Sequence, residues 1–239
     1  IATAIAALES QSQALEEPFI CSNEAPYDKC PRTHKDMDLL RALKVSCNNY
    51  FIHLGESLGR ETLENYLLDT LHFSLEPGKS FDSFSAIANG VIGQELIRVS
   101  PWQMAQLIAI IANDGYGYQT NAPWQEQIVS ALEKKGESKI TDFDQKPVPI
   151  ISTETAHILQ EDLAAAVDLP DGTHLTYAGK TGTPEIYDGS GSKKYLAWYV
   201  GYAPAEQPKY AVAIVIEDIA GLPASELSGG KYALPFFQD

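Results

Sequence analysis

One short run of residues constrains the fold of this chain more than any other feature: Lys180-Thr181-Gly182-Thr183. It follows residues 177–179 and precedes two further segments with strand-like patterning. Such a run suits a strand edge that holds a carboxylate, because the lysine supplies positive charge, the threonine hydroxyls supply donors, and the glycine lets another backbone lie close. Three common residues in this order also arise by chance, so the run predicts a function only together with companion motifs.

A companion motif lies upstream, where Ser46 and Asn48 form a Ser-x-Asn triplet between two helix-like stretches. Between the two motifs, a further helix is predicted to start at Ser100, with Pro101 in its first turn and Gln103 placed to bond back to the cap. In this order the motifs resemble the transpeptidase domain of penicillin-binding proteins, whose motif set is S-x-x-K, S-x-N and K-T-G. The resemblance extends over essentially the whole chain.

The resemblance implies a serine enzyme of peptidoglycan synthesis, with a role in cell division or cell shape. In that family a serine attacks a D-alanyl-D-alanine stem peptide or a β-lactam and forms an acyl-enzyme. By resemblance, Ser46 would relay a proton, Asn48 would bond the substrate amide, and Lys180 would attract the terminal carboxylate. Substrate binding is expected from the residues that follow the lysine: Thr181, Gly182 and Thr183. A helix cap, a buried amide and a solvated lysine remain the structural alternatives for the first three.

The nucleophile motif S-x-x-K is not found where the family has it. In the family that motif precedes an alanine-rich helix much like residues 1–8, so we expect the attacking serine on a segment before Ile1, and expect the chain to be truncated at both ends. Ser190 and Lys193 match S-x-x-K literally, but a Gly/Ser loop does not hold two side chains one helical turn apart. Whether the chain alone is an enzyme is therefore uncertain. The alternative is a non-catalytic module that binds stem peptide or β-lactam, and a β-lactamase ranks last.

Composition limits the classes of partner. The formal net charge of -15 argues against nucleic acid and anionic membrane surfaces, which would repel the chain. No apolar run in the sequence is long enough to cross a bilayer, so membrane attachment is expected only through an N-terminal anchor outside it. The resemblance implies an extracytoplasmic location and no cofactor.

The chain has three cysteines. Cys21 and Cys30 flank a proline-containing loop and could form a disulfide in an oxidising compartment. Zinc binding with His34 is the rival interpretation, which we disfavour because two cysteines and one histidine at this spacing match no common site. Two free thiols remain possible. Cys47, the middle residue of the S-x-N triplet, is interpreted as a small buried hydrophobe, and no metal is expected.

The resemblance implies an α+β fold, with a five-stranded antiparallel sheet flanked by helices and a mostly helical subdomain. We expect one domain, with a mostly helical part at 1–175 and a sheet part at 176–239. The patterning predicts helices at 1–15, 36–44, 49–58, 61–71, 106–113 and 153–167, a loop at 75–94, a hairpin at 128–143, and strands at 176–182, 195–203 and 210–217. Two family strands precede the nucleophile and pair beside the last strand, so residues 210–217 are expected to leave an open edge here.

Overall fold

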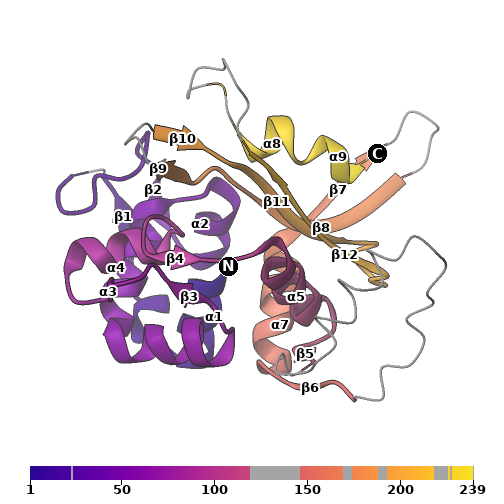
Figure 1. The fold of residues 1–239 in the computed structure, drawn as a ribbon, viewed down its shortest axis with the longest axis horizontal. Coiled ribbons are helices and arrows are strands. Elements are labelled where there is room, and N and C mark those ends of the chain that lie inside the picture. The colour runs from indigo at the N-terminus through magenta and orange to yellow at the C-terminus, as the bar shows by residue number, and fades with distance from the viewer. Residues whose placement is uncertain are drawn as a thin grey trace.

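The computed structural model describes residues 1–22, 24–118, 146–168, 174–187, 193–217, 226 and 228–238. Figure 1 shows two parts: a helical lobe made by the first hundred residues, coloured indigo to magenta, and a sheet with helices on both faces. Helices and an antiparallel sheet in one chain make this an α+β fold, as predicted.

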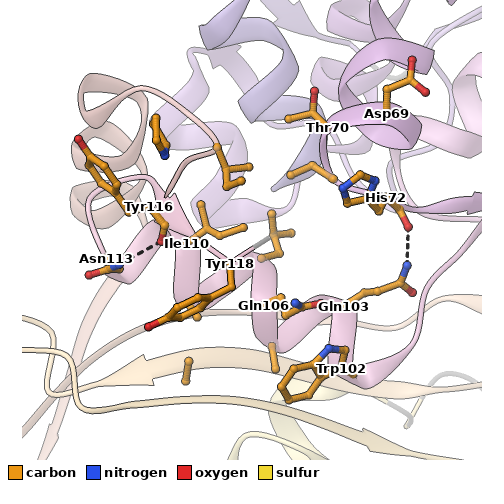
Figure 2. Close-up of a pocket in the computed structure, with 18 residues that line it drawn as sticks. Asp69, Thr70, His72, Trp102, Gln103, Gln106, Ile110, Asn113, Tyr116 and Tyr118 are labelled. Carbon is orange, nitrogen blue, oxygen red and sulfur yellow. Dashed lines mark hydrogen bonds between the residues drawn. The ribbon is translucent and has the colours of Figure 1, made fainter. Parts of the chain in front are cut away.

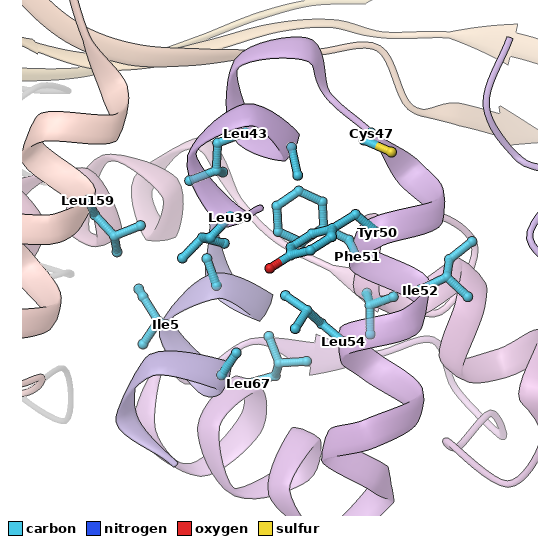
Figure 3. Packing of buried hydrophobic residues seen from close by; sticks show 14 of the residues in the cluster. Ile5, Leu39, Leu43, Cys47, Tyr50, Phe51, Ile52, Leu54, Leu67 and Leu159 are labelled. Atoms are coloured by element: carbon cyan, nitrogen blue, oxygen red, sulfur yellow. The ribbon is translucent and has the colours of Figure 1, made fainter. Parts of the chain in front are cut away.

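The helical lobe packs around α1 and α3. Its elements are α1 (Ala2–Glu9), η1 (Gln13–Leu15), α2 (Leu39–Val45), α3 (Asn48–Glu64), η2 (Asn65–Thr70) and α4 (Phe84–Val91), with the short pairs β1 (Phe19–Cys21) with β2 (Lys35–Met37) and β3 (Ser74–Leu75) with β4 (Ile97–Arg98). Figure 3 shows Ile5 from α1, Leu43 from α2 and Leu54 from α3 meeting in the core, where all three are buried. The small alanine side chains of α1 let the neighbouring helices approach closely.

The sheet has the strand order β12-β11-β8-β7, all antiparallel. Its strands are β7 (Ala164–Asp168), β8 (His174–Gly182), β11 (Ala197–Ala203) and β12 (Tyr210–Ile216). Helices α5 (Pro101–Ala112) and α7 (Thr153–Leu163) cover the face toward the helical lobe, and α8 (Gly229–Tyr232) and α9 (Pro235–Gln238) cover the other face (Figure 1). Two short pairs complete the described elements: β5 (Tyr116–Gly117) with β6 (Val148–Pro149), and β9 (Glu185–Tyr187) with β10 (Lys193–Tyr195).

Several local predictions are confirmed. Ser100 and Gln103 form a complete capping box at the start of α5, with Pro101 in the first turn. Helix α3 departs from helical geometry at Gly59, which has φ of 70°, where the sequence predicts a stop. In the described part of the chain, β12 pairs only with β11, so its other edge is open as expected.

Two predictions are wrong. The predicted loop at 75–94 contains α4, which Ser83 caps by accepting a hydrogen bond from the Ala86 amide. The predicted helix at 153–167 ends at Leu163, and its alanine-rich tail forms β7, so the sheet begins before residue 176. Alanine favours helices, but pairing with β8 outweighs that preference at these residues. The predicted hairpin at 128–143 lies outside the described residues.

No helix in the described ranges combines the length and apolar character that a bilayer span requires.

Candidate active site

Ser46 occupies a sharp turn between two helices. Helix α2 begins at its cap Asp38 and ends at Ser46, whose backbone is left-handed with φ of 54° and ψ of 53°. The Cys47 amide donates to Ala42 O at 2.9 Å, and α3 begins at Asn48. A non-glycine residue with positive φ is uncommon, and residues in such strained conformations cluster at active sites and tight turns. Here the turn leaves the Ser46 hydroxyl exposed while Cys47 between the two motif residues is buried.

Lys180 reaches Ser46 from the sheet. Side chains alternate along β8, so Lys180 lies on the same face as Ala178, which packs in the core shared with the helical lobe. The Lys180 ammonium donates hydrogen bonds to Ser46 Oγ at 2.5 Å and to Thr181 O at 3.1 Å. The fold therefore joins two motif residues that lie 134 positions apart in the sequence.

Burial lowers the pKa of Lys180 below the ordinary lysine value. The unfolded chain then holds this proton more tightly than the folded chain, so the ammonium costs stability below the folded pKa, and the penalty is relieved as pH rises toward the unfolded value. We expect Lys180→Met to raise the free energy of unfolding at neutral pH and this advantage to shrink toward about pH 10. Urea unfolding across that range tests this, with the exposed Lys209→Met as control. A gain in the free energy of unfolding of Lys180→Met that does not change with pH would contradict this prediction.

One edge of β8 is open beside Lys180. Strand β11 pairs with β8 at residues 178–182, but β7 pairs only with residues 174–178. Among the described strands, none covers the second edge of β8 at residues 179–182. An open edge of this kind can pair with an extended peptide through main-chain hydrogen bonds.

The threonines of the motif lie differently from Lys180. The Thr181 side chain lies on the opposite face of β8 from Lys180, next to α8, since a Cβ added at Gly230 would lie 3.8 Å from Thr181 Cγ2. Thr183 Oγ1 accepts a hydrogen bond from the Gly229 amide at 3.2 Å, which leaves the hydroxyl hydrogen to donate elsewhere. Both threonines therefore border α8, and the donation of their hydroxyls to one substrate carboxylate stays a prediction.

Asn48 ties the start of α3 to the preceding loop. Its Nδ2 donates to Lys29 O at 3.0 Å. An amide nitrogen carries two hydrogens, so the second hydrogen and Oδ1 can still meet a substrate. The half-buried side chain thus serves the structure and keeps binding capacity.

The Cys21–Cys30 disulfide predicted from the sequence is not formed. All three cysteines are free and buried, and Cys30 Sγ lies 3.8 Å from Cys47 Sγ, far beyond the S–S bond length of about 2.05 Å. Cys21 Sγ instead lies 3.7 Å from His34 Nδ1. The four side chains converge, so Cys47 is more than the small core residue that the sequence suggests.

A hollow beside α5 lies apart from Ser46 and Lys180, neither of which lines it. Figure 2 shows it beside α5, with a volume of about 800 Å³ and with His72, Trp102 and Tyr118 on its walls. It contains no member of the two motifs, and its wall ends at Tyr118, next to a stretch outside the described residues. The chemistry of the side chains therefore favours the Ser46–Lys180 site over this hollow as the candidate active site. Ser190, the rejected nucleophile candidate, also lies outside the described residues.

Comparison with known proteins places this geometry in context. The family described as "Penicillin binding protein transpeptidase domain" matches residues 1–239. Peptidoglycan D,D-transpeptidase PbpA of Mycolicibacterium smegmatis is 29% identical over 213 residues, which cover 83% of this chain and 42% of that protein. Stage V sporulation protein D of Bacillus subtilis is 27% identical over 267 residues, covering 98% of this chain and 39% of that protein. The chain thus spans less than half the length of these relatives.

Solved structures show the same fold. PBPA from Mycobacterium tuberculosis superimposes with a TM-score of 0.69 at 23% identity, covering 99% of this chain and 57% of that one. Its ceftriaxone acyl-enzyme complex gives a TM-score of 0.72 at 22% identity, with the same coverage. The D,D-transpeptidase domain of a peptidoglycan glycosyltransferase from Eggerthella lenta gives 0.65 at 23% identity, covering 92% of this chain and 59% of that one.

Proposed function

Because this chain belongs to the penicillin-binding protein transpeptidase domain family, we propose that it forms part of a peptidoglycan D,D-transpeptidase that acts on D-Ala-D-Ala stem peptides through a serine acyl-enzyme. The observation that carries the proposal is the 2.5 Å hydrogen bond between Lys180 Nζ and Ser46 Oγ, beside the open edge of β8. A binding-only module needs a carboxylate anchor and a strand edge, but it has no need of a hydroxyl held against an ammonium.

The attacking serine is assigned to a segment that precedes Ile1. The backbone nitrogen of Ile1 is buried, and it lies near the Lys180 ammonium. The first residue of the given sequence therefore lies beside the Ser46–Lys180 site. A helix continued backward from α1 would enter the same site, where a serine and a lysine one turn apart could be placed.

Each motif residue has a defined task in this mechanism. A substrate strand pairs with the edge of β8 at residues 179–182, where Gly182 has no side chain to obstruct it. Thr183 and Lys180 hold the terminal carboxylate, and the Thr183 N–H contributes half of an oxyanion hole. Ser46 accepts a proton from the Lys180 ammonium on one lone pair and donates its own hydroxyl proton to the leaving amine, so it acts as a relay. Thr181 O accepts a hydrogen bond from Lys180 Nζ at 3.1 Å, which helps to hold the ammonium in place.

The partners and location follow from this proposal. β-Lactams would occupy the stem-peptide site and acylate the same serine. Since stem peptides lie outside the cytoplasm, the domain would act on the outer side of the cytoplasmic membrane. Two relatives, MrdA of Haemophilus influenzae and PbpA of Mycolicibacterium smegmatis, are both named peptidoglycan D,D-transpeptidases.

A fluorescent penicillin tests where the acyl group forms. The full-length protein is labelled, digested and mapped by mass spectrometry, and the adduct is expected on a serine of an S-x-x-K motif before Ile1. An adduct on Ser46, Ser190 or another serine of the chain would overturn the assignment of the nucleophile. Saturable binding of penicillin with no covalent adduct would instead favour the non-catalytic alternative.

A further inference from the structure

Four metal-binding side chains that the proposed function does not use meet beneath the S-x-N turn. They are Cys21 at the end of β1, Cys30 and His34 in the following loop, and Cys47 at the start of α3. All three cysteines of the chain take part, and they come from separate parts of the sequence. The cysteines are buried and His34 is partly buried. If the cysteines were buried only as small hydrophobic residues, there would be no reason for the His34 imidazole to direct Nδ1 toward Cys21 Sγ.

The spacing of the donor atoms fits one tetrahedral ion. With Zn–S bonds of about 2.3 Å, a tetrahedral site places its sulfur atoms about 3.8 Å apart. Cys30 Sγ and Cys47 Sγ are separated by 3.8 Å, and Cys21 Sγ and His34 Nδ1 by 3.7 Å. All four donor atoms lie within 4.8 Å of one another. A set of three thiols and one imidazole is among the donor sets of structural zinc sites.

Asn49 donates hydrogen bonds to two sulfur atoms of the cluster. Its backbone N–H points to Cys30 Sγ at 3.5 Å, and its side-chain Nδ2 points to Cys21 Sγ at 3.5 Å. The same side chain accepts a hydrogen bond from the Lys29 amide through Oδ1 at 2.9 Å. N–H groups directed at sulfur stabilise thiolates, which are the form that binds metal, and such outer contacts orient the ligands. Asn49 is fully buried, so it is held in this arrangement.

The loop itself lacks other regular structure. The described residues between β1 and β2 form no helix and no strand, and those two strands are three residues each. A cross-link at Cys21, Cys30 and His34 would fix this loop against α3. Because Cys47 directly follows Ser46, the same link would fix the turn that presents the Ser46 hydroxyl.

We propose that Cys21, Cys30, His34 and Cys47 bind one structural Zn²⁺ ion that anchors the loop of residues 22–34 to the S-x-N turn. The ion coordinates four protein ligands, so it has no open position for substrate and takes no part in the chemistry. Its role is to position Ser46 through the adjacent Cys47.

The test measures metal in the full-length protein, purified without added metal or chelator. Mass spectrometric metal analysis is expected to find about one zinc per chain. Removing it with a chelator should lower the unfolding temperature, and adding Zn²⁺ back should restore it. Cys30→Ser and His34→Asn are each expected to weaken zinc binding at least about tenfold. His157→Asn, an exposed histidine on α7, is the matched control and should keep the metal.

Zinc content does not depend on penicillin reactivity, so this proposal and the proposed function can fail separately. Where a variant does not fold, the chelation and readdition experiment on the unmodified protein gives the answer. Isolation without zinc and no rise in unfolding temperature on adding Zn²⁺ would overturn the proposal. A disulfide between any two of the cysteines in the isolated protein would overturn it as well.

Discussion

Replacing Ser46 with alanine or glycine in the full-length protein is expected to slow acylation by penicillin about 10²- to 10⁴-fold, the usual range for losing a positioned proton-transfer group. The physical reason is the contact with Lys180, whose ammonium lies 2.5 Å from Ser46 Oγ. Without the hydroxyl, no group of this turn can pass a proton between Lys180 and the leaving amine. The measurement is the second-order rate constant for labelling by a fluorescent penicillin.

The glycine variant separates chemistry from folding. Ser46 has φ of 54°, a backbone conformation that costs a non-glycine residue about 1 kcal/mol or more and costs glycine little. The free energy of unfolding of Ser46→Gly should therefore lie within about 1 kcal/mol of the wild-type value. Its acylation should be slowed by the same factor as that of Ser46→Ala. Ser57→Ala, at an exposed serine of α3, is the control and should react normally. Normal reactivity of Ser46→Gly would contradict the relay.

Lys180 gives a second view of the same contact. Lys180→Met should lose acylation to a similar extent although the removal of a buried charge favours folding. A protein that becomes more stable and less reactive through one substitution is the behaviour of a functional residue held at a cost in stability. A variant that loses both stability and reactivity with penicillin would indicate that Lys180 has a structural role.

The contact between Ser46 and Lys180 could be anticipated from the order of two motifs, but the local patterns alone do not contain it. The sequence predicts β11 and β12 well because their β-branched and aromatic residues suit a covered sheet, and it predicts β8 from the Lys-Thr-Gly motif at its end. It does not predict β7, because an alanine-rich run is equally good helix until β8 pairs with it. The fold class was therefore accessible from the sequence, and the sheet boundary was not.

Side-chain direction and clustering are the parts that the sequence hides. Alternation along β8 places Thr181 on the opposite face from Lys180, a consequence of register that a motif read as a string does not express. Cys47 is a second case, because it appears as the variable residue of a triplet. Its approach to Cys21, Cys30 and His34 depends on how the loop returns to α3, and a sequence spacing does not fix that return.

Gly229→Ala is expected to destabilise the protein by about 1–3 kcal/mol and to slow acylation, although it lies outside both motifs. Helix α8 begins at Gly229, directly against the end of β8. A Cβ at Gly229 would lie 2.1 Å from Trp198 O and 2.8 Å from Gly182 O. Both contacts are with backbone oxygens, which cannot change rotamer as a side chain can, so α8 must move away from β8. That movement would break the 3.2 Å hydrogen bond from the Gly229 amide to Thr183 Oγ1 and shift the proposed carboxylate site.

The neighbouring glycine supplies the control for this prediction. A Cβ at Gly230 meets only Thr181 Cγ2, at an ordinary 3.8 Å, and alanine is favoured over glycine in a helix by about 1 kcal/mol. Gly230→Ala should therefore leave the free energy of unfolding unchanged or slightly higher, and it should react with penicillin at the normal rate. Urea unfolding and the acylation rate are measured for both variants. Equal effects at the two glycines would mean that close backbone contact with α8 does not support the motif. Thr183 would then act independently of α8.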